Sequence, residues 1–216
     1  MAAIYRIIDR GVFSNSNPIS GHYSYARHQD SKIVYDLCTN PVIIERLAAL
    51  YGPDLILWNS SFWVKNRTSK IVPWHQDLHY WKVAFSFTAW IAITPTSKSN
   101  GCLKVIPASH HKILPMAPAP QSALFEEMAD TALLNDDKSI ELELRAGEFV
   151  LLSDRILHGS DANNASDARI GLAARYTIPC IKLFQDQLPF FPGHKAFLVS
   201  GQDKFNLNDM GAPPSD

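Results

Sequence analysis

The stretch 83-VAFSFTAWIAIT-94 is apolar almost throughout and rich in β-branched and aromatic residues. Such a run is typical of a β-strand that is buried on both faces. The segment 54-DLILWNSSFWVK-65 has the same character, and shorter strand candidates follow it, separated by turns such as 95-PTSKSNG-101 and Ala146-Gly147. The shorter candidates are 102-CLKVIP-107, 140-IELEL-144, 148-EFVLLS-153 and 169-RIGLAARYTI-178.

Helical patterns precede these strands and interrupt them once. Residues 31–52 predict two helical pieces, because apolar residues recur there at helical spacing. Asn40 can cap the second piece, Pro41 suits its first helical position, and Gly52 ends it. The stretch 121-QSALFEEMADTALL-134 predicts one further helix, entered through a proline-rich segment.

Helices followed by many strands favour a mainly β fold, namely a double-sheet jelly roll or barrel with the N-terminal helices packed on one sheet. We expect a single domain over residues 1–200. Residues 201–216 are expected to form a mobile C-terminal tail, because they carry little apolar content beyond Phe205 and Leu207.

Composition excludes several classes of protein. Apolar residues make up 46% of the chain and charged residues 19%, so a packed core is expected and overall disorder is not. The net charge of −1 gives no electrostatic sign of a nucleic-acid or membrane partner. There is no apolar run long enough to span a membrane and no pattern of a signal peptide. Three scattered cysteines, odd in number, favour reduced thiols and a cytoplasmic protein.

The most informative local sequence is 73-PWHQDLHYW-81. Side chains alternate across a strand, so His75 and Asp77 are expected on one face, where both could bind one cation. One imidazole and one carboxylate make two thirds of the 2-His-1-carboxylate set that holds Fe(II). His158, at the end of an apolar strand candidate, is the candidate third ligand. His79 stays open as an alternative to His75.

Other histidines are weaker candidates for metal binding. His28-Gln29-Asp30 repeats the same tripeptide, but it precedes every core strand, so we expect a capping or surface role. His110 and His111 are adjacent and read as loop residues, and neither His22 nor His194 has a partner at ligand spacing.

An arginine follows the candidate third ligand at a suggestive distance. Arg169 lies eleven residues after His158, so a strand that turns back would return it near the metal. Its guanidinium could bind a carboxylate through two hydrogen bonds. Such a co-substrate dianion would neutralise the combined charge of the metal, Asp77 and Arg169. Arg175 competes for the same role.

Taken together, His75-Gln76-Asp77, 100-NGCLKVIPASHHK-112, 157-LHGS-160 and Arg169 resemble the phytanoyl-CoA dioxygenase family. The resemblance spans roughly residues 40–180, with the motifs in the expected order. Members of that family use Fe(II), 2-oxoglutarate and O2, and they fold as a double-stranded β-helix, a cupin-like jelly roll. The resemblance therefore implies this fold and these cofactors here.

The family pattern also assigns residues. It implies that His75, Asp77 and His158 bind iron, and that Arg169 and Ser160 bind the distal carboxylate of 2-oxoglutarate. Asn59 and Trp90 fall where relatives have groups near the co-substrate, although core packing is the favoured role for Trp90. Lys65 corresponds to a family lysine of open role. A carboxylate at position 77 favours hydroxylation over chlorination, since related halogenases have a small residue there.

The function implied is hydroxylation of an aliphatic C–H bond in a small metabolite or a lipid-like molecule. Residues 112–139 fall where relatives have a variable lid. One alternative is a non-catalytic jelly-roll binding protein, and another is a zinc hydrolase with the same three ligands. The oligomeric state is left open. Candidate substrate contacts are Tyr80, Trp81, Phe125, Met128 and Arg175.

Overall fold

The computed structural model describes residues 23–130, 132, 138–187 and 193–215. Three α-helices are described, α2 (Lys32–Cys38), α3 (Pro41–Tyr51) and the short α4 (Leu78–Trp81). The remaining regular structure is almost entirely antiparallel β-sheet, with single 3₁₀ turns such as η1 (Lys98–Asn100) and η2 (Ser109–His111) between strands.

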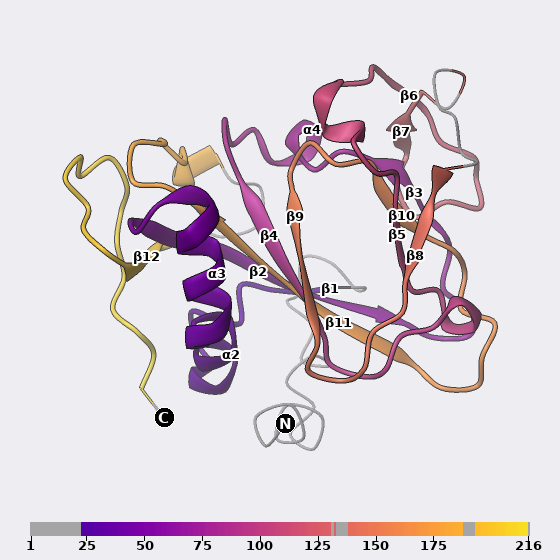
Figure 1. Cartoon of the computed structure of the whole chain (residues 1–216), viewed down its shortest axis with the longest axis horizontal. Coiled ribbons are helices and arrows are strands. Elements are labelled where there is room, and N and C mark those ends of the chain that lie inside the picture. The colour runs from indigo at the N-terminus through magenta and orange to yellow at the C-terminus, as the bar shows by residue number, and fades with distance from the viewer. Residues whose placement is uncertain (1–22, 131, 133–137, 188–192, 216) are drawn as a thin grey trace.

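The larger sheet has the strand order β1-β2-β11-β4-β9, and β12 also pairs with β2 (Figure 1). The long strands β2 and β11 pair over most of their lengths. The members of this larger sheet are β1 (Tyr23–Tyr25), β2 (Leu55–Lys65), β4 (Phe87–Ala92), β9 (Phe149–Ser153), β11 (Arg169–Thr177) and β12 (Phe197–Ser200).

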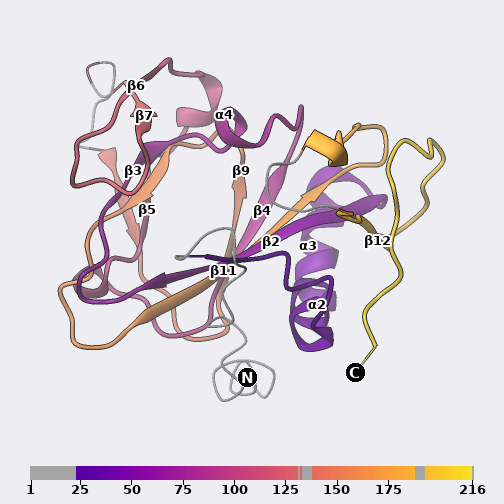
Figure 2. The ribbon, with the colours of Figure 1, turned by 180° about the vertical axis from the view of Figure 1, so that it is seen from behind.

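A smaller sheet faces one end of the larger one, as the reverse view in Figure 2 shows. Its strand order is β3-β10-β5-β8, and a two-stranded ribbon, β6-β7, lies beside it. These strands are β3 (Val72–His75), β5 (Leu103–Val105), β6 (Met116–Pro118), β7 (Glu127–Ala129), β8 (Ile140–Leu142) and β10 (His158–Ser160). Two facing antiparallel sheets form the expected cupin-like jelly roll.

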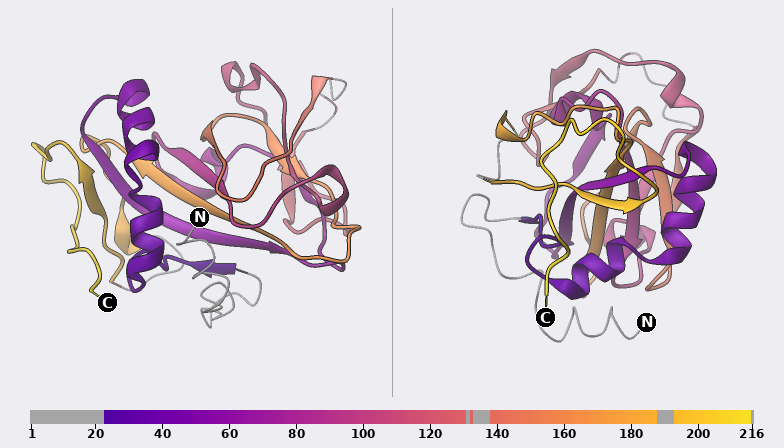
Figure 3. Two further views of the ribbon diagram at one scale, coloured as in Figure 1. Left: turned by 60° about the horizontal axis from the view of Figure 1, so that its bottom comes forward. Right: turned by 90° about the vertical axis from the view of Figure 1, so that its left-hand side faces the viewer.

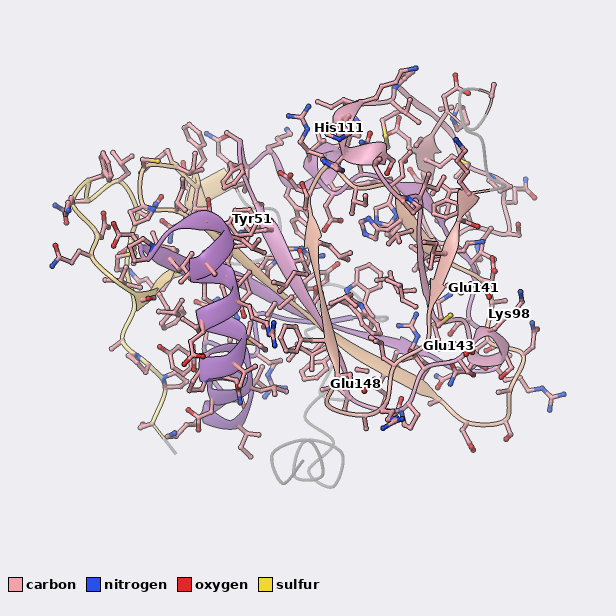
Figure 4. All side chains as sticks on the ribbon, viewed as in Figure 1. Tyr51, Lys98, His111, Glu141, Glu143 and Glu148 are labelled. Atoms are coloured by element: carbon pink, nitrogen blue, oxygen red, sulfur yellow. The ribbon has the colours of Figure 1, made fainter. Side chains whose placement is uncertain are left out.

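Helices α2 and α3 cover the outer face of the larger sheet (Figure 3). Leu47 of α3 and Leu172 of β11 are both fully buried in the resulting apolar layer. Tyr51, labelled in Figure 4, stacks on Phe87 of β4 with ring centroids 3.9 Å apart, and the Tyr176 hydroxyl donates to a carbonyl of α2. This confirms that the N-terminal helices pack on one sheet.

The opposite face of the larger sheet looks toward the smaller sheet. Because side chains alternate, Ala173 and Arg175 of β11 point to this inner face while Leu172 and Tyr176 point to the helices. Trp90 of β4 lies opposite Ala173 in the register and shares the inner face. The space between the sheets is therefore lined by residues of β11 and β4, and it contains the candidate site.

The predicted helix at residues 121–134 is wrong for the residues described there. The chain instead forms turns and then β7, which pairs with β6 across a hairpin. The pairing of β6 with β7, in which Ala117 lies opposite Met128, explains the difference, because tertiary strand pairing overrides a moderate helical pattern. The bond between the Leu124 amide and the Ile71 carbonyl, 2.9 Å long, holds the same segment against β3.

The tail after β12 makes defined contacts. Its Asp209 accepts from Lys195, and the backbone of residue 196 pairs with residues 209 and 211. The side chain of Asn208 binds the backbone of Leu183 and Ile181. The expected mobility of residues 201–216 stays a prediction, as does the single-domain boundary at residue 200. None of the helices among the described residues has the length and apolar character needed to cross a membrane.

The N-terminal cap of α3 gives a test of how local sequence starts this helix. Asn40 Oδ1 accepts from the Val42 amide at 3.0 Å, and Pro41 occupies the first turn, as predicted. We expect Asn40→Ala to lower the free energy of unfolding by about 1 kcal/mol in urea denaturation. Asn40→Asp keeps a capping carboxylate and is expected to match the parent chain. Equal losses in both variants would show that the cap contributes nothing.

Candidate metal centre

Strand pairing brings the three predicted ligands together. In the antiparallel pair of β3 and β10, His158 lies opposite His75 in the register. Asp77 Oδ1 is 3.6 Å from His75 Nε2 and 3.8 Å from His158 Nε2. One ligand atom from each residue lies within 4.8 Å of the other two. Among the residues that the structure describes, no other group of three or more His, Cys, Asp or Glu side chains converges in this way.

The route by which Asp77 reaches this position differs from the predicted one. Strand β3 ends at His75, and Asp77 has helical backbone angles (φ −58°, ψ −29°) at the start of α4. A turn therefore brings the carboxylate back toward the imidazole, where strand alternation was expected to do so. His79 lies on α4 and donates from Nε2 to the Leu114 carbonyl at 3.0 Å, so the alternative ligand points elsewhere.

Both imidazoles are oriented by their own strands. His75 Nδ1 donates to the Pro73 carbonyl at 2.8 Å, and His158 Nδ1 donates to the Ile156 carbonyl at 3.0 Å. These bonds place the proton on Nδ1 and leave the Nε2 lone pairs directed at Asp77 Oδ1. Burial, with the neighbouring His75, lowers the pKa of His158 to about 4, so its imidazole is neutral near physiological pH.

The donor set fits a divalent transition metal. Burial by itself raises the pKa of Asp77, but the Arg175 guanidinium, with the adjacent His75 and His158, outweighs it and holds the pKa below its usual range. Two neutral imidazoles and one ionised carboxylate are the ligands of a 2-His-1-carboxylate iron site with open positions. His75, Asp77 and His158 would hold the ion. Metal binding itself stays a prediction.

Arg175 belongs to the same cluster through Asp77. Its Nε lies 3.5 Å from Asp77 Oδ2, the oxygen that faces away from the histidine pair. Nη1 donates to Ser61 Oγ at 2.6 Å, and the guanidinium carbon lies 4.6 Å from the centre of the Trp81 ring. Arg175 is only 2% exposed, so these contacts fix it beside the carboxylate. Arg175 therefore pairs with Asp77, and this pairing makes it a poor candidate for binding a co-substrate carboxylate.

Arg169 lies elsewhere on the lining of the same cavity, together with Ser160 and Trp90. Its Nε and Nη2 donate to the Gly101 carbonyl at 3.2 and 2.9 Å, and it packs over the Trp90 ring at 5.2 Å. Nη1 takes no part in these bonds. Burial lowers the pKa of Arg169 to about 10, which keeps the guanidinium charged. The geometry is compatible with the predicted role of Arg169 in binding a carboxylate.

A glycine makes room for this arrangement. A Cβ atom on Gly171 would lie 2.1 Å from the Trp90 ring, so a side chain here would displace the tryptophan. Trp90 can therefore lie flat against β11 beneath Arg169. Trp90 was expected to serve either the core or the co-substrate. The structure places it in both settings, since it lines the cavity and also packs in an apolar cluster with Leu103 and Leu152.

The remaining predicted residues separate into those near the metal centre and those away from it. Phe125 contacts His75 edge to face, with ring centroids 5.0 Å apart, and Tyr80 lies 5.6 Å from the same ring. Trp81 packs against Trp58 and supports Arg175. Met128 packs against an apolar cluster of Trp74, Ile106, Leu114, Ala129 and Leu157, and its predicted contact with the substrate stays a prediction.

Asn59 is a buried polar residue of β2, next to Arg175 in the larger sheet. It lies opposite Arg175 in the pairing of β2 with β11, so the two side chains share the inner face. Its Oδ1 is buried and has no hydrogen-bond partner among the described residues. Asn59 is not one of the residues that line the metal cavity. Its predicted role near the co-substrate stays a prediction.

The second copy of the ligand tripeptide makes no metal site. His28 is fully buried and its Nδ1 pairs with Ser60 Oγ at 2.8 Å, while Asp30 pairs with Arg27 at 2.8 Å. His28 is therefore a core histidine, where a capping or surface role was expected. Burial, with the neighbouring His194, lowers the pKa of His28 to about 3, so it is neutral. His110 and His111 lie exposed in η2, as predicted for loop residues.

Gln76 is a positioning residue that the sequence reasoning missed. Its amide donates to the carbonyls of Lys112 and Arg155, at 2.9 and 2.5 Å, and its Oε1 accepts from the Leu114 amide at 2.9 Å. The side chain thereby ties the turn between two ligands to the loop that leads to His158. The only sign of this role in the sequence was its place between His75 and Asp77. The structure adds that the amide is fully buried, so its hydrogen bonds must be satisfied within the protein.

Gln76→Ala removes all three bonds and leaves the buried Leu114 amide and two partly buried carbonyls without this partner. We expect it to weaken Ni(II) binding roughly 10- to 100-fold in a calorimetric titration, because the ligand geometry loses its support. Gln29→Ala is the matched control, since Gln29 occupies the same position in the other tripeptide and accepts one bond from Lys195. A similar loss of Ni(II) affinity in both variants would refute the positioning role.

Arg175→Met removes the charge that faces Asp77 Oδ2. The pKa of Asp77 should then rise, so protons compete with the metal, and we expect Ni(II) affinity to fall more at acid pH than at neutral pH. Arg175→Lys keeps a cation at this position and should retain most of the affinity. If the two variants bind Ni(II) alike across the pH range, the charge of Arg175 does not act on the metal centre.

Comparison with known proteins agrees with this geometry. The family model for phytanoyl-CoA dioxygenase (PhyH) matches residues 15–171. The human peroxisomal phytanoyl-CoA dioxygenase is 26% identical over 162 residues, which cover 68% of this chain and 47% of the human protein. The chain thus spans about half the length of the curated relatives that it matches.

Solved structures share the fold. The apo form of the non-heme monooxygenase ThoJ matches with a TM-score of 0.79 and 21% identity, over 99% of this chain and 81% of ThoJ. CytC3 with Fe(II) and α-ketoglutarate matches with a TM-score of 0.73 and 22% identity, over 96% of this chain and 82% of CytC3. The family model covers well over half of the chain, including the turn that carries His75 and Asp77, as well as His158 and Arg169. The chain therefore belongs to the phytanoyl-CoA dioxygenase family.

Proposed function

We propose that this protein is an Fe(II)- and 2-oxoglutarate-dependent dioxygenase that hydroxylates an aliphatic C–H bond of a small metabolite or lipid-like molecule. The observation that supports this most directly is the convergence of His75, Asp77 and His158 within 4.8 Å, from two paired strands and one turn. Membership in the family supports the oxygenase class, and the CytC3 structure with Fe(II) and α-ketoglutarate supports the cofactors.

When bound, iron, 2-oxoglutarate and O2 together supply the oxidising chemistry, in which 2-oxoglutarate is converted to succinate and CO2 while the substrate is oxidised. The protein supplies the binding groups. In this proposal Arg169, with Ser160 nearby, binds the distal carboxylate of 2-oxoglutarate. Asp77 stays ionised beside Arg175, and His75 and His158 present Nε2 as ligand atoms.

The cavity lining combines the polar groups of the metal centre with apolar side chains. Apolar side chains from both sheets line it, and Phe125 covers one side of His75. The apolar part of the lining suits an aliphatic substrate. The apolar lining residues are Trp63, Val72, Trp90, Leu103, Leu152 and Ala173. Because all three cysteines are free, we also propose a reducing compartment, the cytoplasm, as its location.

Direct binding of the cofactors tests the proposal. Anaerobic addition of Fe(II) and 2-oxoglutarate should give a weak visible charge-transfer band, and O2 should then yield succinate. Asp77→Ala is expected to abolish both the band and succinate formation. If the parent chain shows no band and no succinate across a broad panel of substrates, the protein is a non-catalytic jelly-roll relative.

Arg169→Ala separates binding of the co-substrate from binding of the metal. We expect about a 10- to 100-fold weaker affinity for 2-oxoglutarate in the band titration, because a charge-assisted interaction is lost, with Ni(II) affinity retained. Arg145→Ala, at an exposed arginine away from the cavity, is the control. An unchanged affinity in the Arg169 variant would mean that another group binds the distal carboxylate.

A further inference from the structure

A second pocket opens beside the metal cavity, at the loop between β2 and β3. We call it the β2–β3 pocket. Trp63, Val72 and Arg169 line both this pocket and the metal cavity, so the two spaces adjoin. The pocket is lined by Trp63, Val64, Lys65, Asn66, Thr68, Ser69, Lys70, Val72, Leu124 and Arg169.

The charged residues that line the β2–β3 pocket are all cationic. Lys65, Lys70 and Arg169 line it, and its described lining includes no Asp or Glu. Arg169 is also charged and buried. Hydroxyl and amide groups of Asn66, Thr68 and Ser69 add neutral donors near the opening. Such a set of donors recognises an anion.

Lys65 is the buried one of the two lysines that line the pocket, at 4% exposure. Its ammonium donates to two backbone carbonyls, of Lys70 at 2.9 Å and Asp161 at 2.6 Å. An ammonium has three N–H donors, so one is left over from these bonds. The Asp161 carboxylate is shared with Lys104, whose Nζ lies 2.7 Å from Oδ1. Lys65 thus has neutral oxygens as direct partners and a partly neutralised carboxylate nearby.

Burial and a neighbouring cation both act against the charged form of Lys65. Burial first, and then the adjacent Arg169, lower the pKa of Lys65 to about 7. A bound anion would favour the charged ammonium and relieve the repulsion between the two cations. Lys70 adds a second ammonium at the edge, where its Nζ donates to the Gln121 carbonyl at 3.0 Å.

The net charge of the metal centre also favours a negatively charged substrate. With Arg175 present, a divalent metal, Asp77 and Arg169 carry more positive charge than 2-oxoglutarate brings negative charge. Lys65 increases this excess. A substrate that also carries negative charge would reduce the cost of burying the assembly, whereas a cationic substrate would raise it.

The pocket has an apolar side as well. Trp63, Val72 and Leu124 contribute to it, and Leu124 is held beside β3 by its backbone bond to Ile71. A ligand that combines an anionic end with an apolar body would therefore meet complementary groups at both ends.

We propose that the β2–β3 pocket binds the anionic end of the substrate, a carboxylate or a phosphate, through Lys65 and Lys70, with the apolar part of the molecule beside Trp63 and the metal cavity. The inference rests on the proposed oxygenase function and adds the substrate class, an anionic amphiphile. The distal carboxylate of 2-oxoglutarate is a second source of the same chemistry, so the experiment must separate the two.

The test uses the full chain loaded with Ni(II) and saturating 2-oxoglutarate, so that no turnover occurs. Hexyl phosphate, hexanoate and the neutral 1-hexanol are titrated by calorimetry. We expect at least one of the two anions to bind and hexanol not to bind. Added salt should lower the affinity for the anion. Lys70→Gln should lower the affinity for the anion by about fivefold, which is the effect expected from losing a partly exposed ion pair. The affinity for 2-oxoglutarate should not change.

Lys204→Gln is the control, an exposed lysine in the tail, which lies beside β12 (Figure 1). It should leave anion binding unchanged. Leu124→Asp adds a carboxylate to the lining and should weaken the anion without removing a lysine. Equal affinities in the Lys70 and Lys204 variants would place the anion elsewhere and overturn the inference. Binding that vanishes once 2-oxoglutarate is saturating would also overturn it, because the pocket would then serve the co-substrate.

Failure of this inference differs from failure of the oxygenase proposal. If Ni(II) and 2-oxoglutarate bind but neither anion does, the substrate class is wrong and the cofactor assignment stands. If 2-oxoglutarate does not bind to the Ni(II)-loaded chain in a direct titration, the oxygenase proposal fails, and the inference that rests on it is overturned as well.

Discussion

The register between β3 and β10 is the constraint on which the candidate site depends. Because His158 lies opposite His75, two imidazoles from distant parts of the sequence reach one point. Gly159 allows this close pairing, since a Cβ atom there would lie 2.8 Å from the Val72 carbonyl. A shift of one residue would turn His158 to the other face of the smaller sheet and leave only the local pair of His75 and Asp77.

Burial of charge is the second determinant of the site. Asp77, Arg169 and Arg175 are almost fully buried, which is stable only when each charge has a partner or a ligand. Asp77 and Arg175 provide this for each other, whereas Arg169 is satisfied by a carbonyl and an aromatic ring. The larger sheet therefore presents one arginine that is committed to the protein and one that retains donors for a ligand. The two differ by their positions along β11 and by nothing in their chemistry.

Much of the fold could be predicted from local patterns. The two helical pieces, the cap at Asn40 and the long strands follow from periodicity and turn residues, and the structure confirms them. The region around Phe125 could not be predicted, because its pairing as β6 with β7 is a tertiary choice that overrides helical spacing. The convergence of the three candidate ligands was predicted on the right residues, although the reason given for Asp77 was wrong. The roles of Gln76 and Arg175 needed coordinates, since their partners come from other elements.

Leu124 and Phe125 are neighbours in the chain, yet they serve different spaces. Leu124 lines the β2–β3 pocket, and Phe125 contacts His75. A peptide unit joins them, so a backbone shift that moves one also moves the other. The β2–β3 pocket and the metal cavity thus share one short segment of backbone. Variation in this short segment would retune which molecules are accepted while the metal-binding strands stay unaltered.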